Sequence, residues 1–180
     1  MASIEELDRL PPEAFGAEMA PLFEGAPGFL GRLAEARPFG TDEALFARAR
    51  AIAHAMPESE QRELVDAHPR LGAPPASVSP MSYVEQGFDR QTTDEHAEAD
   101  RMRVAAELER LNEAYEARFG FRYCVFVAGR PRAALLPAFR EALEADRATE
   151  LSRALDAVID IAQDRYRSVA PSAPVRAGGR

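Results

Sequence analysis

The sequence contains a single cysteine, Cys124, and no lysine, so that all 22 of its basic residues are arginine. One cysteine excludes an internal disulfide bond, and a reducing compartment such as the cytoplasm is therefore expected. Cys124 lies within an apolar run, which favours a buried thiol over a reactive one. Arginine in place of lysine, together with abundant alanine, is typical of proteins from GC-rich bacterial genomes.

Long apolar runs and a basic charge balance are also missing. No apolar stretch approaches the roughly 18 residues that a membrane-spanning helix needs, and the acidic start of the chain lacks the pattern of a signal peptide. The net charge of −8 argues against nucleic-acid and anionic-membrane partners, because both favour basic surfaces. The sequence therefore predicts a small-molecule partner rather than a nucleic acid or a membrane.

Motifs for metals and phosphates are absent as well. The three histidines and the single cysteine show none of the spacings that bind zinc, and no H-E-x-x-H sequence occurs. A glycine-rich phosphate loop is not present either. We therefore predict no metal site and no bound cofactor.

Proline and glycine divide the chain into segments with helical patterns, and the apolar content of 46% is sufficient for one sizeable core. We predict a single all-α domain, a bundle of about eight helices over residues 1–168, followed by a disordered tail at 169–180. Residues 121–127 are β-branched and aromatic, and the pattern leaves a strand and a buried connector open. The expected helical segments are 3–9, 12–23, 27–36, 43–56, 58–67, 80–88, 93–118, 132–144 and 149–167.

His68 stands at the end of one of these segments and is followed by Pro69. Proline disfavours helical conformation at the residue before it, so the helix is expected to end at His68. Histidine is the one side chain whose unperturbed pKa lies near neutrality. We therefore predict a titratable side chain in a rigid turn, outside the core, as a candidate for acid/base chemistry.

The segment that begins at Pro80 carries a second group of polar side chains. At about 100° per residue, Ser82, Glu85 and Gln86 share one flank of a helix. The flank is either a solvated polar face or a carboxylate with hydroxyl and amide partners that faces His68. In the second case Glu85 would raise the pKa of His68 or fix its tautomer. The apolar flank of the same segment is formed by Met81, Val84 and Phe88.

The last helical segment places an arginine on its apolar stripe. Arg165 follows Val158 by seven residues and falls about 20° from it around the helix, in line with Leu151 and Leu155. A guanidinium that faces the core needs a partner. Arg165 either extends to solvent at the helix end or anchors an anion such as a carboxylate at the rim of a pocket.

These segments together resemble the 2-oxo-4-hydroxy-4-carboxy-5-ureidoimidazoline (OHCU) decarboxylase family over about residues 7–167. The family's His-Pro-Asp-Leu-(Ala/Gly) signature corresponds to His68–Gly72, and its Ser-x-x-Glu-Gln motif corresponds to Ser82–Gln86. Its Arg-Phe-Gly-Phe motif corresponds to Arg118–Phe121, and an Arg-Pro-Phe motif corresponds to Arg37–Phe39. Four motifs in this order are far more specific than any one of them.

The resemblance implies a helical enzyme that converts OHCU to (S)-allantoin in urate degradation, without a cofactor and as a homodimer. It implies that His68 is the general acid/base and that Glu85 and Gln86 bind the ring or ureido nitrogens. Arg165 would hold an anionic or carbonyl oxygen, and the main chain after Phe121 would bind the ring. The substrate-binding residues implied in this way are Pro69, Ser82, Tyr83, Val84, Glu85, Gln86, Tyr123, Cys124, Val125, Phe126, Val127 and Arg165.

The chain departs from the family pattern at two positions. Arg70 stands where the family usually has aspartate, and Arg122 stands where it often has proline. A changed signature favours an alternative, a non-catalytic helical module of the same fold that binds a small anion or a protein partner. A histidine phosphotransfer bundle is a further alternative, but Pro69 argues against it, because the phosphorylated histidine of such bundles lies within a helix.

Overall fold

The computed structural model describes residues 1–90 and 95–170, and in that part of the chain it is all-α, without a strand. The prediction of a single helical domain is confirmed; the predicted tail falls almost entirely on residues 171–180, outside the described part. The α-helices are α1 (Ile4–Arg9), α2 (Pro12–Met19), α3 (Pro27–Glu35), α4 (Asp42–Ala55), α5 (Glu58–Asp66), α6 (Pro80–Glu85), α7 (Glu95–Phe119), α8 (Leu136–Ala142) and α9 (Arg147–Val169). Short 3-10 helices are η1 (Ala20–Leu22), η2 (Pro75–Ser77), η3 (Phe88–Arg90) and η4 (Arg132–Leu135).

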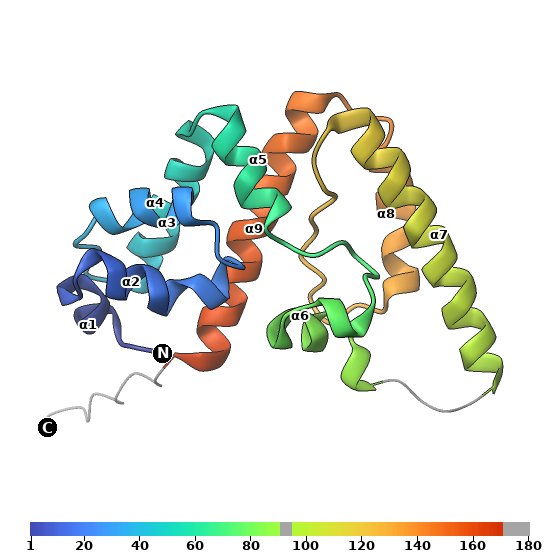
Figure 1. The fold of residues 1–180 in the computed structure, drawn as a ribbon, viewed down its shortest axis with the longest axis horizontal. Coiled ribbons are helices and arrows are strands. Elements are labelled where there is room, and N and C mark those ends of the chain that lie inside the picture. Colours follow the sequence, from blue (N-terminus) through green and yellow to red (C-terminus); the bar gives the residue numbers. More distant parts are fainter. Residues whose placement is uncertain (91–94, 171–180) are drawn as a thin grey trace, which may run out of the picture.

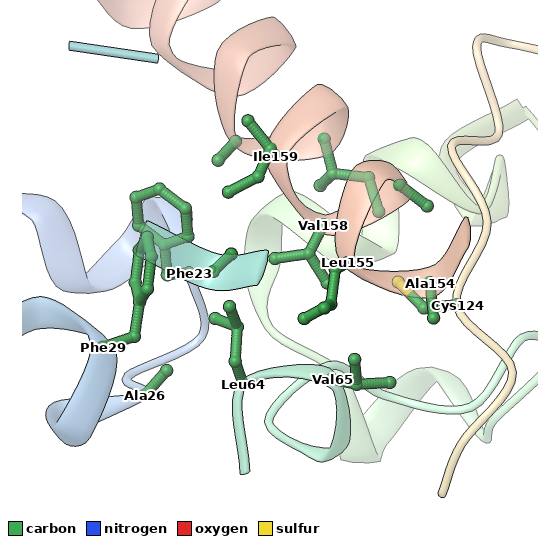
Figure 2. Close-up of a cluster of buried hydrophobic side chains, with 14 of the residues drawn as sticks. Phe23, Ala26, Phe29, Leu64, Val65, Cys124, Ala154, Leu155, Val158 and Ile159 are labelled. Atoms are coloured by element: carbon green, nitrogen blue, oxygen red, sulfur yellow. The ribbon is translucent and has the colours of Figure 1, made fainter. Parts of the chain in front are cut away.

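Helix α9 runs through the middle of the molecule, with α1–α5 on one side and α6–α8 on the other (Figure 1). It packs against α4, α5 and η1 along its length. Its apolar stripe includes Leu155 and Val158, which are at most 1% exposed and meet Leu64 and Phe23 in the core (Figure 2). Burial of this stripe fixes the phase of α9 and therefore the direction of every other side chain on it.

Polar N-cap residues set the starts of several helices. Thr41 accepts a hydrogen bond from the amide of Ala44, and Ser79 accepts one from the amide of Ser82. Each such cap is worth about 1 kcal/mol because it satisfies an amide that the first helical turn leaves unpaired. The cap at Ser79 matters for function, since it fixes the start of the helix that carries Ser82 and Glu85.

The structure refines the sequence prediction in two segments near the centre of the molecule. Helix α6 ends at Glu85 rather than at Phe88, because Gly87 adopts a φ of +72° and the chain restarts as η3. Residues 121–127 form an extended connector that passes α9 without pairing into a sheet, which resolves the open choice in favour of a buried connector (Figure 1). No helix in the described part is long and apolar enough to cross a membrane.

Candidate active site

A cavity of about 400 Å³ lies where the end of α5, helix α6, the 121–129 connector and α9 meet. Twelve of the thirteen residues predicted as site residues line it, together with Leu71, Arg90, Ala128, Gly129, Ile161 and Asp164. The exception is Tyr83, which is 36% exposed and packs its ring against Phe88 at a centroid distance of 5.4 Å. The structure therefore brings four separate chain segments to one hollow and leaves Tyr83 outside it.

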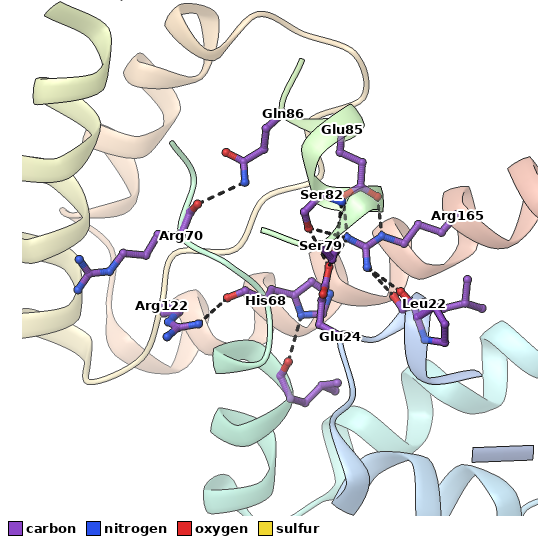
Figure 3. Close-up of polar contacts among 12 residues, drawn as sticks. Leu22, Glu24, His68, Arg70, Ser79, Ser82, Glu85, Gln86, Arg122 and Arg165 are labelled. Atoms are coloured by element: carbon purple, nitrogen blue, oxygen red, sulfur yellow. Dashed lines mark hydrogen bonds and ion pairs between the residues drawn. The ribbon is translucent and has the colours of Figure 1, made fainter. Parts of the chain in front are cut away.

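His68 follows α5 and points into this cavity, but it is more enclosed than the sequence suggested. His68 lies in a turn after α5, as predicted, but it is only 4% exposed, so the expectation that it lies outside the core is wrong. Nδ1 lies 3.2 Å from the carbonyl oxygen of Leu64, and Nε2 has no hydrogen-bond partner among the described residues (Figure 3). A carbonyl only accepts, so Nδ1 carries the proton and Nε2 presents a lone pair to the cavity.

Burial lowers the pKa of His68 to about 4, with the positive charge of Arg165 as the second cause. The carboxylate of Glu24 acts in the opposite direction but does not offset the burial. His68 is therefore neutral near pH 7 and suited to accept a proton or a hydrogen bond at Nε2. The prediction that Glu85 raises the pKa of His68 is wrong, because the carboxylate with this effect belongs to Glu24.

Arg165 is 3% exposed and sits at the wall of the cavity, as its helical phase predicted. Its Nε donates to Oε1 of Glu85 at 2.5 Å, and its Nη2 donates to Oε2 of Glu85 at 2.7 Å and to the hydroxyl of Ser82 at 3.0 Å. Nη1 donates to the carbonyls of Pro21 and Leu22 at 3.1 and 3.2 Å (Figure 3). Every guanidinium nitrogen thus has an acceptor, which makes Arg165 the centre of the polar cluster rather than a free anion anchor.

Glu24 is the functional candidate that sequence reasoning missed. Its Oε1 lies 2.9 Å from Nη2 of Arg165 and accepts hydrogen bonds from Ser79 at 2.7 Å and Ser82 at 2.8 Å. Burial pushes the pKa of Glu24 up, but these hydroxyl contacts and Arg165 outweigh burial and hold the pKa below its usual range. Glu24 and Gly25 both adopt positive φ in the turn after η1, a backbone conformation that is uncommon for glutamate.

Gln86 holds the loop that carries His68. Its Oε1 accepts from the amide of Gly72 at 2.7 Å, and its Nε2 donates to the carbonyl of Arg70 at 3.3 Å. Ser82 is 2% exposed and Gln86 is 8% exposed, so the flank formed by Ser82, Glu85 and Gln86 is not a solvated face. Its polar atoms are directed at the site and at the loop.

The two positions that depart from the family pattern leave the cavity intact. The guanidinium of Arg70 turns away from His68 (Figure 3). It pairs with Glu116 on α7, with Nε–Oε1 at 2.7 Å and Nη2–Oε2 at 2.5 Å. Arg122 donates from Nη1 to the carbonyls of Asp66 and His68 at 2.7 and 2.9 Å. Arg122 therefore ties the extended connector to the histidine loop, and Arg70 contributes only its main chain to the site.

A buried ion pair behind the cavity holds the connector from its other side. Arg153 donates to the carbonyl of Cys124 at 2.9 Å and from Nε to Glu150 at 2.9 Å. Glu150 is 3% exposed and also accepts from the hydroxyl of Tyr115 at 2.7 Å. Burial raises the pKa of Cys124 to about 12, so its thiol is protonated and is a wall of the cavity rather than a nucleophile.

The arrangement provides one neutral imidazole, one guanidinium paired with the carboxylates of Glu24 and Glu85, and a hydroxyl, gathered beside a hollow of small-molecule size. Among the described residues, no three histidine, cysteine, aspartate or glutamate side chains are grouped so that they could hold a metal ion. The available chemistry is therefore proton transfer and hydrogen bonding around a bound molecule.

Comparison with known proteins points in one direction. The family model described as OHCU decarboxylase matches residues 8–167. The chain is 30% identical over 166 residues to the 2-oxo-4-hydroxy-4-carboxy-5-ureidoimidazoline decarboxylase of Haloferax volcanii, covering 91% of this chain and 93% of that protein. It is 24% identical over 172 residues to the uric acid degradation bifunctional protein of Bacillus sp. strain TB-90, covering 94% of this chain.

The chain spans only 32% of the length of that bifunctional protein. Among solved structures, the crystal structure of OHCU decarboxylase in the presence of (S)-allantoin superposes with a TM-score of 0.65. The two share 22% identity, and the match covers 84% of this chain and 96% of that one. This structural likeness shows a common fold.

Proposed function

This chain belongs to the OHCU decarboxylase family, and we propose that it releases the carboxylate of OHCU as CO2 and forms (S)-allantoin in the degradation of urate. The observation that carries the proposal is the unpartnered Nε2 of the buried His68, which faces a cavity of about 400 Å³ beside Glu85 and Arg165. His68 and Glu85 lie in segments that resemble the family's motifs, and Arg165 lies within the residues that the family model matches.

The reaction needs a place for an electron pair and then for a proton. When the bond from C4 to the carboxylate carbon breaks, its electrons form a C4=C5 double bond while the electrons of the ring C=N move to nitrogen. That nitrogen takes up a proton, which leaves a neutral enol. The enol then loses the proton of its 4-hydroxyl group and C5 takes up a proton, which gives the carbonyl and the new stereocentre of allantoin. Overall, release of CO2 from the carboxylate consumes one proton, which solvent supplies. The substrate thus supplies its own electron sink, and the proposal involves no cofactor.

We propose that neutral His68 accepts the proton of the 4-hydroxyl through Nε2, because its low pKa leaves a lone pair there at neutral pH. Proton delivery to one face of C5 sets the (S) configuration. Placing the base within hydrogen-bond reach of the hydroxyl converts a solution encounter into an internal step, and such positioning is worth several kcal/mol.

The other polar groups are proposed to orient the substrate. The carboxylate oxygens of Glu85 each retain a lone pair beside the bond to Arg165, so they can accept N–H groups of the ureido chain or ring. Arg165 holds Glu85 and Ser82 in place and supplies positive charge for the anionic substrate. Main-chain groups of Tyr123–Val127 and the side chains of Gln86, Pro69 and Val84 complete the proposed binding surface; Tyr83 is not included, because it does not line the cavity.

The direct test is turnover with OHCU generated in situ from urate, followed by the optical signal of (S)-allantoin. We expect enantiopure product to form faster than the spontaneous reaction with the wild-type chain, also in the presence of a metal chelator. His68→Asn is expected to return the rate to the spontaneous level while the circular dichroism spectrum stays unchanged. A wild-type chain that binds allantoin but gives no acceleration would instead support the non-catalytic binding module.

We also propose that the protein works in the cytoplasm as a homodimer. The single free cysteine is consistent with a reducing compartment. Met102 is an apolar residue that is 66% exposed, and it offers surface for a second copy. Light scattering of the purified chain at several concentrations tests the dimer, and a mass of one chain throughout would refute it.

A further inference from the structure

A second cavity, of about 330 Å³, adjoins the candidate active site and is lined by four arginines. We call it the arginine cavity; its arginines are Arg90 of η3, Arg101 of α7, Arg130, and Arg132 at the start of η4. Gln86, Arg90 and Gly129 line both cavities, so the two hollows are neighbours. One carboxylate, that of Asp100, lines it as well, which leaves a local excess of positive charge in a chain whose net charge is −8.

Arg132 is the most informative of the four. Its guanidinium lies 4.3 Å from the centre of the Phe88 ring, and it makes no hydrogen bond or ion pair with any described residue of the chain. Burial lowers the pKa of Arg132, and the positive charge of Arg101 lowers it further. A partly buried cation beside a like charge is a cost to the fold, which an anion bound between the two arginines would offset.

Of the remaining arginines, Arg130 contacts only carbonyl groups among the described residues, whereas Arg90 and Arg101 each pair with a carboxylate that does not line the cavity. Arg130 donates to the carbonyls of Phe126 and Val127 at 2.6 and 3.0 Å, and carbonyl groups hold a guanidinium in place without neutralising it. Arg90 lies 3.5 Å from Asp89, and its side chain is 57% exposed. Arg101 pairs with Glu98, a residue that does not line the cavity.

We propose that the arginine cavity binds a small oxyanion, a carboxylate or a phosphate. The planar guanidinium group matches the paired oxygens of a carboxylate or a phosphate, and arginine stays protonated even beside other positive charges. The volume suits a small molecule, because ligand pockets of this class begin at about 300 Å³. The oxyanion is either the carboxylate of the substrate on its way to His68 or a free anion that binds independently of turnover.

Titration calorimetry with inorganic phosphate tests the site without any need for the decarboxylation reaction. We expect saturable binding at low ionic strength. For Arg132→Gln we expect a dissociation constant at least tenfold higher than that of the wild type, which corresponds to a loss of about 1.4 kcal/mol in binding free energy. Arg48→Gln is the matched control, because Arg48 is exposed on α4 and its loss changes the net charge equally. Arg101→Gln also weakens binding in this proposal and serves if Arg132→Gln fails to fold.

Absence of saturable binding, or equal affinity in the wild type, Arg101→Gln and Arg48→Gln, would overturn the proposal. Kinetics then separate the two sources of the anion. If the cavity lies on the substrate's route, phosphate inhibits competitively and Arg132→Gln raises KM with little change in kcat. If the cavity takes a free anion, Arg132→Gln weakens phosphate binding by the same factor of at least ten and leaves KM unchanged. Because binding is measured without substrate, its failure is distinguishable from failure of the proposed decarboxylation.

Discussion

Glu85 and Arg165 are joined by two contacts, Nε–Oε1 at 2.5 Å and Nη2–Oε2 at 2.7 Å, so that the guanidinium binds the carboxylate in a bidentate way. The pair links α6 to α9 across the wall of the cavity. Because Arg165 holds both carboxylate oxygens of Glu85, the protein itself sets the orientation in which Glu85 would meet a substrate. Structure and proposed catalysis therefore depend on the same contact.

Replacing Arg165 by lysine separates charge from geometry. An ammonium group cannot bind both oxygens of Glu85 and also serve Glu24 and the carbonyls of Pro21 and Leu22. Because the site is buried, we expect Arg165→Lys to lower the free energy of unfolding by about 3 kcal/mol and to reduce kcat/KM by at least about tenfold. Urea unfolding and initial rates measure the two effects.

Arg167→Lys is the control for Arg165→Lys, since Arg167 is exposed on the same helix. It should match the wild type in both measurements. A normal melting temperature for Arg165→Lys with impaired kinetics would mean that the cluster re-forms around lysine. In that case Arg165 acts mainly on the substrate.

Glu24→Gln tests the residue that completes the cluster. The amide keeps the shape and can still accept from Ser79 and Ser82, but it removes the negative charge that raises the pKa of His68. We expect the pKa of His68 to fall below its already lowered value and kcat/KM to drop. The imidazole resonances of His68, followed by NMR against pH, give the pKa directly.

The control for Glu24→Gln is Glu43→Gln, which changes the same charge at an exposed position of α4. It should leave the His68 titration where it is. A rise in the pKa of His68 in Glu24→Gln would contradict the electrostatic role given to Glu24. A purely structural role for Glu24 would lower stability without moving the titration.

The low pKa of His68 predicts a specific dependence of stability on pH. Between pH 6.5 and about 4, the unfolded chain binds a proton at His68 and the folded chain does not. Stability therefore falls as pH falls through this window, by about 3 kcal/mol in total, and does not change from this cause above pH 6.5. His68→Gln removes the titrating group. Between pH 7 and pH 4 the free energy of unfolding of this variant should therefore fall by about 3 kcal/mol less than that of the wild type.

Urea unfolding of the wild type and of His68→Gln at several pH values measures the difference. Carboxylates also titrate in this range, but their effect on stability is the same in both proteins and therefore cancels when the two curves are compared. Parallel curves would show that His68 is not held neutral by burial.

Local patterns predicted most of the helices and singled out His68, the flank of Ser82, Glu85 and Gln86, and Arg165, whereas the other predicted site residues came from the family resemblance. The apolar period of α9 directs Arg165 inward, and the Ser79-Pro80 start sets the phase of α6, which brings Ser82 and Glu85 to one side. The same phase argument speaks against Tyr83, which lies about 100° from Ser82 around the helix. Tyr83 is part of the predicted site because it lies within the Ser-x-x-Glu-Gln motif, and not because of its position around the helix.

Contacts between distant segments could not be predicted in the same way. Nothing near Glu24 in the sequence indicates that its carboxylate meets Arg165, because that contact depends on how η1 packs against α9. The burial of His68 likewise results from tertiary packing and not from its turn. The direction of the Arg70 side chain was open for the same reason, since its partner Glu116 lies on α7.

Exchanging the charges of Arg70 and Glu116 tests whether the departure from the family signature affects the reaction. Arg70→Asp restores the family's usual residue but places a carboxylate beside Glu116, with Glu113 and Glu109 also near. The pair is partly exposed, so we expect a loss of no more than about 1 kcal/mol in stability. Because the Arg70 side chain does not line the cavity, kcat/KM should stay within about twofold of the wild type, a change of less than about 0.5 kcal/mol.

The double variant Arg70→Asp/Glu116→Arg re-creates the ion pair in reverse and should recover the lost stability. A large change in kcat/KM for Arg70→Asp, retained in the double variant, would show that the charge at this position reaches the substrate.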